Sequence, residues 1–230
     1  MKSVDYRRMI IRCFISLFLF LECFGVAAQT DSIRQDKPAI RPLIIPAALT
    51  VYAFVALKAQ FLQDFDHHIN DHMSHGRTKV DDYLQYSPGA AFYILTAAGV
   101  RSRYGLGRGT ILYAMTTVAA GGSAFVLKKL IHSSRPDGSD NEGFPSAHMA
   151  IAFSGAEFLR QEFKDNSPWI GIAGYAVATA TGYLRIYNEQ HWFSQLLAGA
   201  GIGMITARLS YWVFPWVEKK LLNPHKIFYF

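Results

Sequence analysis

The chain has 230 residues, of which 51% are hydrophobic and 17% charged, and its net charge at pH 7 is +6. That length has room for one domain and little else. The basic residues lie at the ends of apolar blocks and form no stripe interleaved with aromatic residues, which argues against nucleic-acid binding and is typical of a polytopic membrane protein.

Residues 1–28 have the pattern of a secretory signal peptide. Four basic residues precede a short apolar stretch: Lys2, Arg7, Arg8 and Arg12. Small residues follow it, so we expect cleavage near Ala28, with an uncleaved anchor as the alternative. Both cysteines, Cys13 and Cys23, lie inside this segment. Its removal would leave a chain without thiols, disulfides or cysteine-ligated metals.

Residues 29–85 contain a polar lead-in, an apolar block over 43–62 and a polar, histidine-rich stretch. Whether the block crosses a membrane is open, although Pro42, Pro46 and Lys58 favour a segment that packs against it. Five residues of the polar stretch recur at helical spacing: His67, His68, Asp71, His72 and His75. A zinc site on one helical face is possible. Charged and amide neighbours on all sides favour a solvated or interfacial helix instead.

After Pro88 the chain consists of apolar blocks joined by short polar segments. The blocks cover 89–100, 109–127, 147–159, 169–187 and 193–217. They predict an all-α fold, a bundle of about five to six transmembrane helices in a membrane domain over 86–217, with a basic tail at 218–230. Small residues recur in GIAGYAVATATG and AGAGIG. We expect helices to pack closely there.

Charged and polar residues gather at the ends of these blocks. Six stand out: Lys128, Arg135, Ser146, His148, Arg185 and His191. One block leaves the membrane face that holds His148 and the next returns to it, so all six are expected on one side. Three cations near a bilayer are costly without an anionic partner.

The start of the 147–159 block completes a predicted phosphate pocket. Ser146 is placed as an N-cap, so the backbone N–H groups of Ala147 and His148 would point outward from a helix N-terminus, which attracts anions. Two histidines add a nucleophile and an acid. The residues themselves therefore predict phosphoryl chemistry.

Together these segments resemble the signature of the type 2 phosphatidic acid phosphatase and haloperoxidase superfamily, which reads K-x6-RP, PSGH and SR-x5-H-x3-D. The first part is complete from Lys128 to Pro136. The second reads PSAH at 145–148, and the third reads LR-x5-H-x3-Q from Leu184 to Gln195. The resemblance covers about residues 86–217. It implies membrane helices that hydrolyse lipid phosphates without a metal or cofactor.

The resemblance also implies a role for each site residue. His191 would attack phosphorus to form a phosphohistidine, and His148 would protonate the leaving group. The phosphoryl oxygens would be held by the remaining groups: Lys128, Arg135, Arg185, Ser146 and the backbone N–H of Ala147. Such groups neutralise charge and align the phosphoryl group for in-line attack.

Three positions depart from the signature: Ala147, Leu184 and Gln195. Gln195 is the most serious, because an amide can accept the imidazole N–H but cannot stabilise an imidazolium by charge. Another carboxylate could substitute for the missing one: Glu189, Asp137, Asp140 or Glu142. The alternative is a non-catalytic protein that binds phosphorylated lipid. An active enzyme is favoured, because the cations and both histidines are present.

The expected substrate is a phosphorylated membrane lipid: phosphatidic acid, phosphatidylglycerophosphate, undecaprenyl diphosphate or phosphorylated lipid A. A lipid phosphotransferase is an alternative, since a second alcohol could replace water, and a haloperoxidase would not need so many apolar spans. The distribution of Lys and Arg places RSRYGLGR, the joint with Arg160 and Lys164, and the tail in the cytoplasm. This predicts a multi-pass protein of the bacterial inner membrane whose active site faces the periplasm. The oligomeric state is open.

Overall fold

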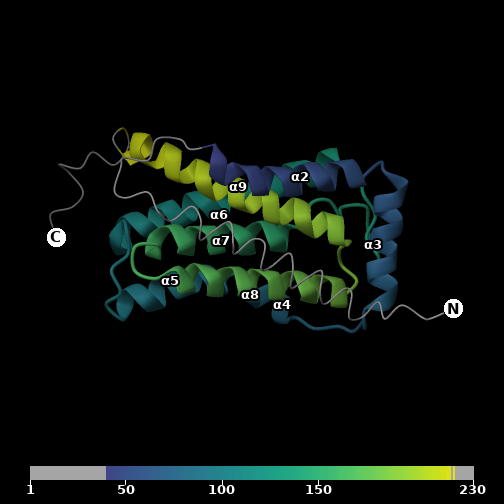
Figure 1. Ribbon diagram of the computed structural model, residues 1–230, viewed down its shortest axis with the longest axis horizontal. Coiled ribbons are helices and arrows are strands. Elements are labelled where there is room, and N and C mark those ends of the chain that lie inside the picture. The colour runs from purple at the N-terminus through teal and green to yellow at the C-terminus, as the bar shows by residue number, and fades with distance from the viewer. Residues whose placement is uncertain (1–39, 219, 221–230) are drawn as a thin grey trace.

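The computed structural model describes residues 40–218 and 220, and within this range its regular elements are helices, apart from one isolated bridge between Ser133 and Glu142 (Figure 1). After a 3-10 turn at Arg41–Leu43 the helices are α2 (Ile44–Ala56), α3 (Gln60–His72), α4 (Val80–Leu84), α5 (Ser87–Ala97), α6 (Gly105–Leu130), α7 (Ala147–Phe163), α8 (Pro168–Tyr187) and α9 (Phe193–Val217). The predicted all-α fold is confirmed. The predicted signal peptide and nearly all of the basic tail lie outside the described residues.

Helix α7 forms the centre of the bundle. It packs against α5, α6, α8 and α9, and most of its side chains are buried. A helix buried on all sides is normally apolar throughout, yet Glu157 of α7 has an exposed fraction of 0%. Arg160 and Arg208 lie 2.8 and 3.0 Å from its carboxylate, so the buried charge is paired.

The small residues of AGAGIG bring α9 against two other helices. A Cβ atom added to Gly199 would collide with the carbonyl oxygen of Ser146, and one added to Gly203 would collide with that of Ala150. Gly201 meets the α2 backbone at Pro46 in the same way. The predicted close packing is confirmed for AGAGIG, and it holds the second turn of α9 against the start of α7.

The apolar block at 43–62 is not one continuous helix. Helix α2 ends at Ala56 and α3 begins at Gln60, and the two axes are bent by 99°. The side-chain amide of Gln63 donates to the carbonyl oxygen of Leu57 at 3.0 Å, which satisfies a free acceptor near the end of α2. Helix α2 packs along α9, whereas α3 stands across one end of the bundle (Figure 1).

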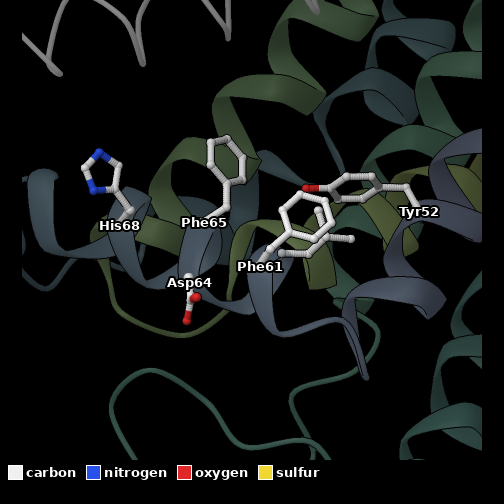
Figure 2. Close-up of a pocket in the computed structure, with 6 residues that line it drawn as sticks. Tyr52, Phe61, Asp64, Phe65 and His68 are labelled. Carbon is white, nitrogen blue, oxygen red and sulfur yellow. The ribbon is translucent and has the colours of Figure 1, made fainter.

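A cavity of about 640 Å³ lies at the bend between α2 and α3 (Figure 2). Its lining is mainly aromatic and apolar: Tyr52, Phe61, Leu62, Asp64, Phe65 and His68. Phe61 is 72% exposed. The bend thus presents aromatic surface outward, as segments at a membrane interface commonly do.

Two helices of the described range, α6 and α9, are long and apolar enough to cross a membrane by themselves. The bent pair of α2 and α3 would add a third span if it is counted as one. Helices α5, α7 and α8 are shorter or less apolar, so they would have to cross as partners within the bundle. The number of five to six crossings stays a prediction.

Candidate active site

The predicted site residues meet at one end of the bundle, where four helix termini come together. They lie in the last turn of α6, the following loop, the start of α7, the last turn of α8 and the α8–α9 loop: Lys128, Arg135, Ser146, Ala147, His148, Arg185 and His191. Alternation of helix direction brings these termini to the same end. Residues up to 63 positions apart in sequence therefore form one site.

The first two cations are held by acceptors of the α6–α7 and α8–α9 loops. Lys128 Nζ donates to the carbonyl oxygen of Glu142. Arg135 donates from Nε to Asp140 Oδ1 at 2.8 Å and from one terminal nitrogen to Gln190 Oε1 at 2.7 Å. These contacts orient both side chains before a substrate arrives, which reduces the ordering cost of binding an anion.

Arg185 is buried and is fixed from helix α4. One terminal nitrogen donates to Asp81 Oδ2 at 2.6 Å, and the other lies 3.4 Å from Gln190 Oε1. Asp81 also accepts a hydrogen bond from Asn188, at 3.0 Å. The buried Nε atom of Arg185 has no partner among the described residues. This leaves one charged donor for a ligand, since a buried N–H is costly without an acceptor.

The start of α7 differs in one detail from the expected N-cap. Ser146 occupies the N-cap position with extended backbone angles, but its side chain makes no capping hydrogen bond. Its Oγ atom is buried and has no partner in the described part of the chain. Two residues later, Nε2 of His148 lies 2.9 Å from Asp82 Oδ1. The Ser146 hydroxyl is thus available to a phosphoryl oxygen, and His148 carries a carboxylate partner.

Gln195 sets the tautomer of His191. Its Oε1 atom lies 3.1 Å from His191 Nδ1 and accepts the backbone N–H of Trp192 at 3.2 Å. Its Nε2 atom donates to Ser133 Oγ and to the Ser134 carbonyl oxygen, both at 3.0 Å. Because a carbonyl only accepts and a backbone N–H only donates, the amide cannot be flipped. His191 Nδ1 must then carry the proton, which leaves the Nε2 lone pair free to act as a nucleophile.

The electrostatic surroundings keep His191 neutral. Burial lowers the pKa of its imidazole well below the usual value of 6.5, and Arg185, Lys128 and Arg135 lower it further. A nucleophilic histidine must be neutral, so these groups protect the reactive form against protonation.

We therefore expect the His191 ring to stay neutral as the pH falls through 6.5, and to protonate only at lower pH. An NMR titration of the histidine ring signals in detergent tests this directly, with the His191 signal assigned as the one missing from a His191→Ala variant. A midpoint at or above 6.5 would contradict the described electrostatics.

Several contacts of the site lie outside the sequence motifs. Asp81 and Asp82 come from the five-residue helix α4. Gln190 occupies one of the five positions between Arg185 and His191 that the motif leaves unspecified. Three carboxylates considered as substitutes for the missing aspartate have other partners: Asp137 binds Gln190, Asp140 binds Arg135, and Glu142 binds Lys129. Among the described residues, His191 Nδ1 contacts Gln195 Oε1 and none of the four candidate carboxylates, so a substitute carboxylate at this nitrogen is not supported.

One group of residues in the described range could hold a metal ion. Asp81, Asp82 and His148 bring one ligand atom each within 4.8 Å of one another. Asp81 is already paired with Arg185, and Asp82 with His148. On α3 the rings of His68 and His72 lie side by side, with centroids 4.2 Å apart.

Comparison with known proteins gives the same assignment as the motifs. The model of the PAP2 superfamily matches residues 109–219. A lipid A 1-phosphatase of Porphyromonas gingivalis is 35% identical over 204 residues, covering 83% of this chain and 45% of that protein. A lipid phosphate phosphatase gamma of Arabidopsis thaliana is 27% identical over 120 residues, covering 42% of this chain and 53% of the relative. The chain spans about half the length of these curated relatives.

One solved structure has the same fold. The transmembrane PAP2-type phosphatidylglycerolphosphate phosphatase of Bacillus subtilis aligns with a TM-score of 0.50 at 17% identity, covering 76% of this chain and 97% of the other. This likeness supports a membrane helix bundle. With the family match and the three motifs in one site, residues 109–219 of the chain belong to the PAP2 superfamily, and the two curated relatives are named as lipid phosphatases.

Proposed function

We propose that the protein is a metal-independent lipid phosphatase that works through a phosphohistidine on His191, with His148 as the general acid. The observation that carries this proposal is the contact of His191 Nδ1 with Gln195 Oε1, which leaves Nε2 as the nucleophilic nitrogen. Burial, Arg185, Lys128 and Arg135 lower the pKa of this ring. Nucleophilic catalysis needs this combination of a free lone pair and a charge-neutralising pocket.

The reaction proceeds in two displacements. In the first, His191 Nε2 forms a bond to phosphorus while the bond from phosphorus to the lipid oxygen breaks, and His148 gives its proton to that oxygen. In the second, water attacks the phosphohistidine, neutral His148 accepts the water proton, and inorganic phosphate leaves with His191 restored. Throughout, Nδ1–H of His191 remains directed to Gln195.

The phosphoryl oxygens are bound by groups that the structure leaves oriented or unpaired. Lys128, Arg135 and Arg185 supply charge, and the Ser146 hydroxyl and the Ala147 backbone N–H supply neutral donors. These cations perform the neutralisation that a metal performs in other phosphatases. Asp82 holds His148 in place. Burial and Arg185 lower the pKa of the His148 imidazole, and the hydrogen bond to Asp82 opposes that shift.

The substrate we propose is a phosphorylated membrane lipid. The similarity to a lipid A 1-phosphatase favours phosphorylated lipid A over phosphatidic acid, phosphatidylglycerophosphate and undecaprenyl diphosphate. We further propose that residues 86–217 form the membrane domain after a lead-in at 29–85, that the protein lies in a bacterial inner membrane, and that the site faces the periplasm. The distribution of basic residues supports this orientation.

Phosphate release by the detergent-purified, full-length protein tests the proposal. The four lipids are supplied in parallel, each with and without EDTA. We expect turnover of at least one lipid, highest with phosphorylated lipid A, and an unchanged rate in EDTA. A rate that EDTA abolishes and a divalent cation restores would contradict the metal-independent mechanism.

A further inference from the structure

Helix α3, which contains the histidine-rich stretch, contacts the residues that follow the proposed nucleophile. The Phe65 and Phe193 rings lie 6.2 Å apart, and the His67 and Trp192 rings lie 4.4 Å apart, both pairs edge to face. Between these pairs, Asp66 of α3 binds Ser194. Three successive residues of α3 thus pair with the three residues that follow His191.

The Asp66 contact is the polar centre of this interface. Asp66 Oδ1 accepts the backbone N–H of Ser194 at 3.0 Å, and Oδ2 accepts the Ser194 hydroxyl. Both residues are only 6% exposed. Ser194 is the second residue of α9, so its N–H has no partner within the helix. A carboxylate at this place satisfies the N–H and interacts favourably with the helix dipole.

The first turn of α9 contains the residue that orients the His191 ring. Gln195, the residue after Ser194, accepts from His191 Nδ1 and binds Ser133 and Ser134 on its other side. A displacement of this turn would shift Gln195 Oε1 and rotate the His191 ring. Asp66 belongs to α3, which precedes the family match at 109–219, whereas Ser133 and Ser134 lie within that match.

We propose that Asp66 is a positioning residue for the nucleophile, acting through Ser194 and the first turn of α9. This inference rests on the proposed phosphatase function. It also gives the α3 segment a role other than metal binding: the helix lines the cavity at the bend (Figure 2). In addition, residues 65–67 contact the three residues that follow His191.

The test uses Asp66→Ala and Asp66→Asn in the full-length protein, with Asp71→Asn as the matched control. Asp71 lies on the same helix and is exposed. We expect Asp66→Ala to lower kcat about 10- to 100-fold at unchanged KM, the scale of loss from a misplaced catalytic group. Asp66→Asn should recover most of the rate, because its amide can accept from the N–H and donate to the hydroxyl. Asp71→Asn should match the wild type.

A double-mutant cycle with Ser194→Ala separates a specific contact from general damage. We expect Asp66→Ala and Ser194→Ala to be non-additive in kcat, because both remove the hydrogen bond between the Asp66 carboxylate and the Ser194 hydroxyl. Additive effects, or a change in KM with kcat unchanged, would overturn the positioning role. If Asp66→Ala does not fold, Ser194→Ala decides alone, because it removes only the hydroxyl contact to Asp66 and should lower kcat at unchanged KM.

Hydrogen exchange provides a readout that does not depend on turnover. Asp66→Ala should speed amide exchange in peptides covering 192–196, while peptides from the α7 core exchange as in the wild type. Unchanged exchange at 192–196 would contradict the inference even in an active enzyme. A wild-type protein that releases no phosphate would instead contradict the proposed function, and the exchange result would still stand.

Discussion

Replacing His191 with alanine should lower kcat for phosphate release by roughly 10⁴-fold or more, the scale seen when an enzymatic nucleophile is removed. The ring is only 2% exposed, its Nδ1 proton is fixed by Gln195, and three cations lie close enough to lower its pKa. Alanine removes the only atom proposed to bond to phosphorus. The remaining cations could still bind the lipid, so KM should change far less than kcat.

The measurement is steady-state phosphate release, together with acid-labile ³²P retained on the protein after rapid denaturation of a reacting sample. Labelled protein should appear with the wild type and be absent with His191→Ala. His132→Ala is the matched control, because His132 is an exposed histidine of the neighbouring loop. His148→Ala should slow the labelling and still permit it, since it removes the acid and leaves the nucleophile. Label that persists in His191→Ala would place the covalent intermediate elsewhere.

The part of the site that could be predicted from sequence lies at helix termini with fixed spacing. Lys128 and Arg135 end one apolar block, His148 begins another, and the alternation of direction brings both to one face. The structure places them together for this reason. Gln190 shows the limit: it contacts both site arginines, yet it occupies a position that the motif leaves unspecified.

The residues that could not be predicted belong to contacts across long stretches of sequence. Asp81 meets Arg185 over 104 positions and Asp66 meets Ser194 over 128. Neither aspartate is part of a pattern, because burial of a carboxylate depends on a partner brought by the fold. The bend between α2 and α3 could not be predicted for a different reason: apolar residues lie on both sides of the break, and Lys58 within it does not indicate a 99° turn.

Gln195 is the second position where substitution should have a large effect. We expect Gln195→Ala to lower kcat by about 10³-fold, less than the roughly 10⁴-fold loss that follows when a protease aspartate becomes asparagine and the histidine adopts the wrong tautomer. Alanine removes the acceptor at Nδ1 and both donors to the Ser133 and Ser134 loop. Gln60→Ala, at an exposed glutamine of α3, should leave kcat unchanged.

Gln195→Asp separates the contribution of orientation from that of charge. A carboxylate would stabilise the cationic phosphohistidine, a gain of about 1.5–3 kcal/mol for a hydrogen bond to a charged group. The same change removes two donated hydrogen bonds, at about 1 kcal/mol each, and shortens the side chain by one carbon. These effects nearly cancel, so kcat should stay within about tenfold of the wild type.

The three outcomes of kinetics on Gln195→Asp assign different roles to the wild-type residue. A rate near the wild type means that Gln195 acts by fixing the His191 tautomer, which it does through an amide whose orientation is set on both sides. A rise of more than about 100-fold would mean that the missing charge, worth nearly 3 kcal/mol, limits the natural enzyme. A wild type that releases no phosphate, together with an active Gln195→Asp, would contradict the proposed phosphatase. The natural chain would then be a lipid-binding protein in which His191 lacks a charged partner.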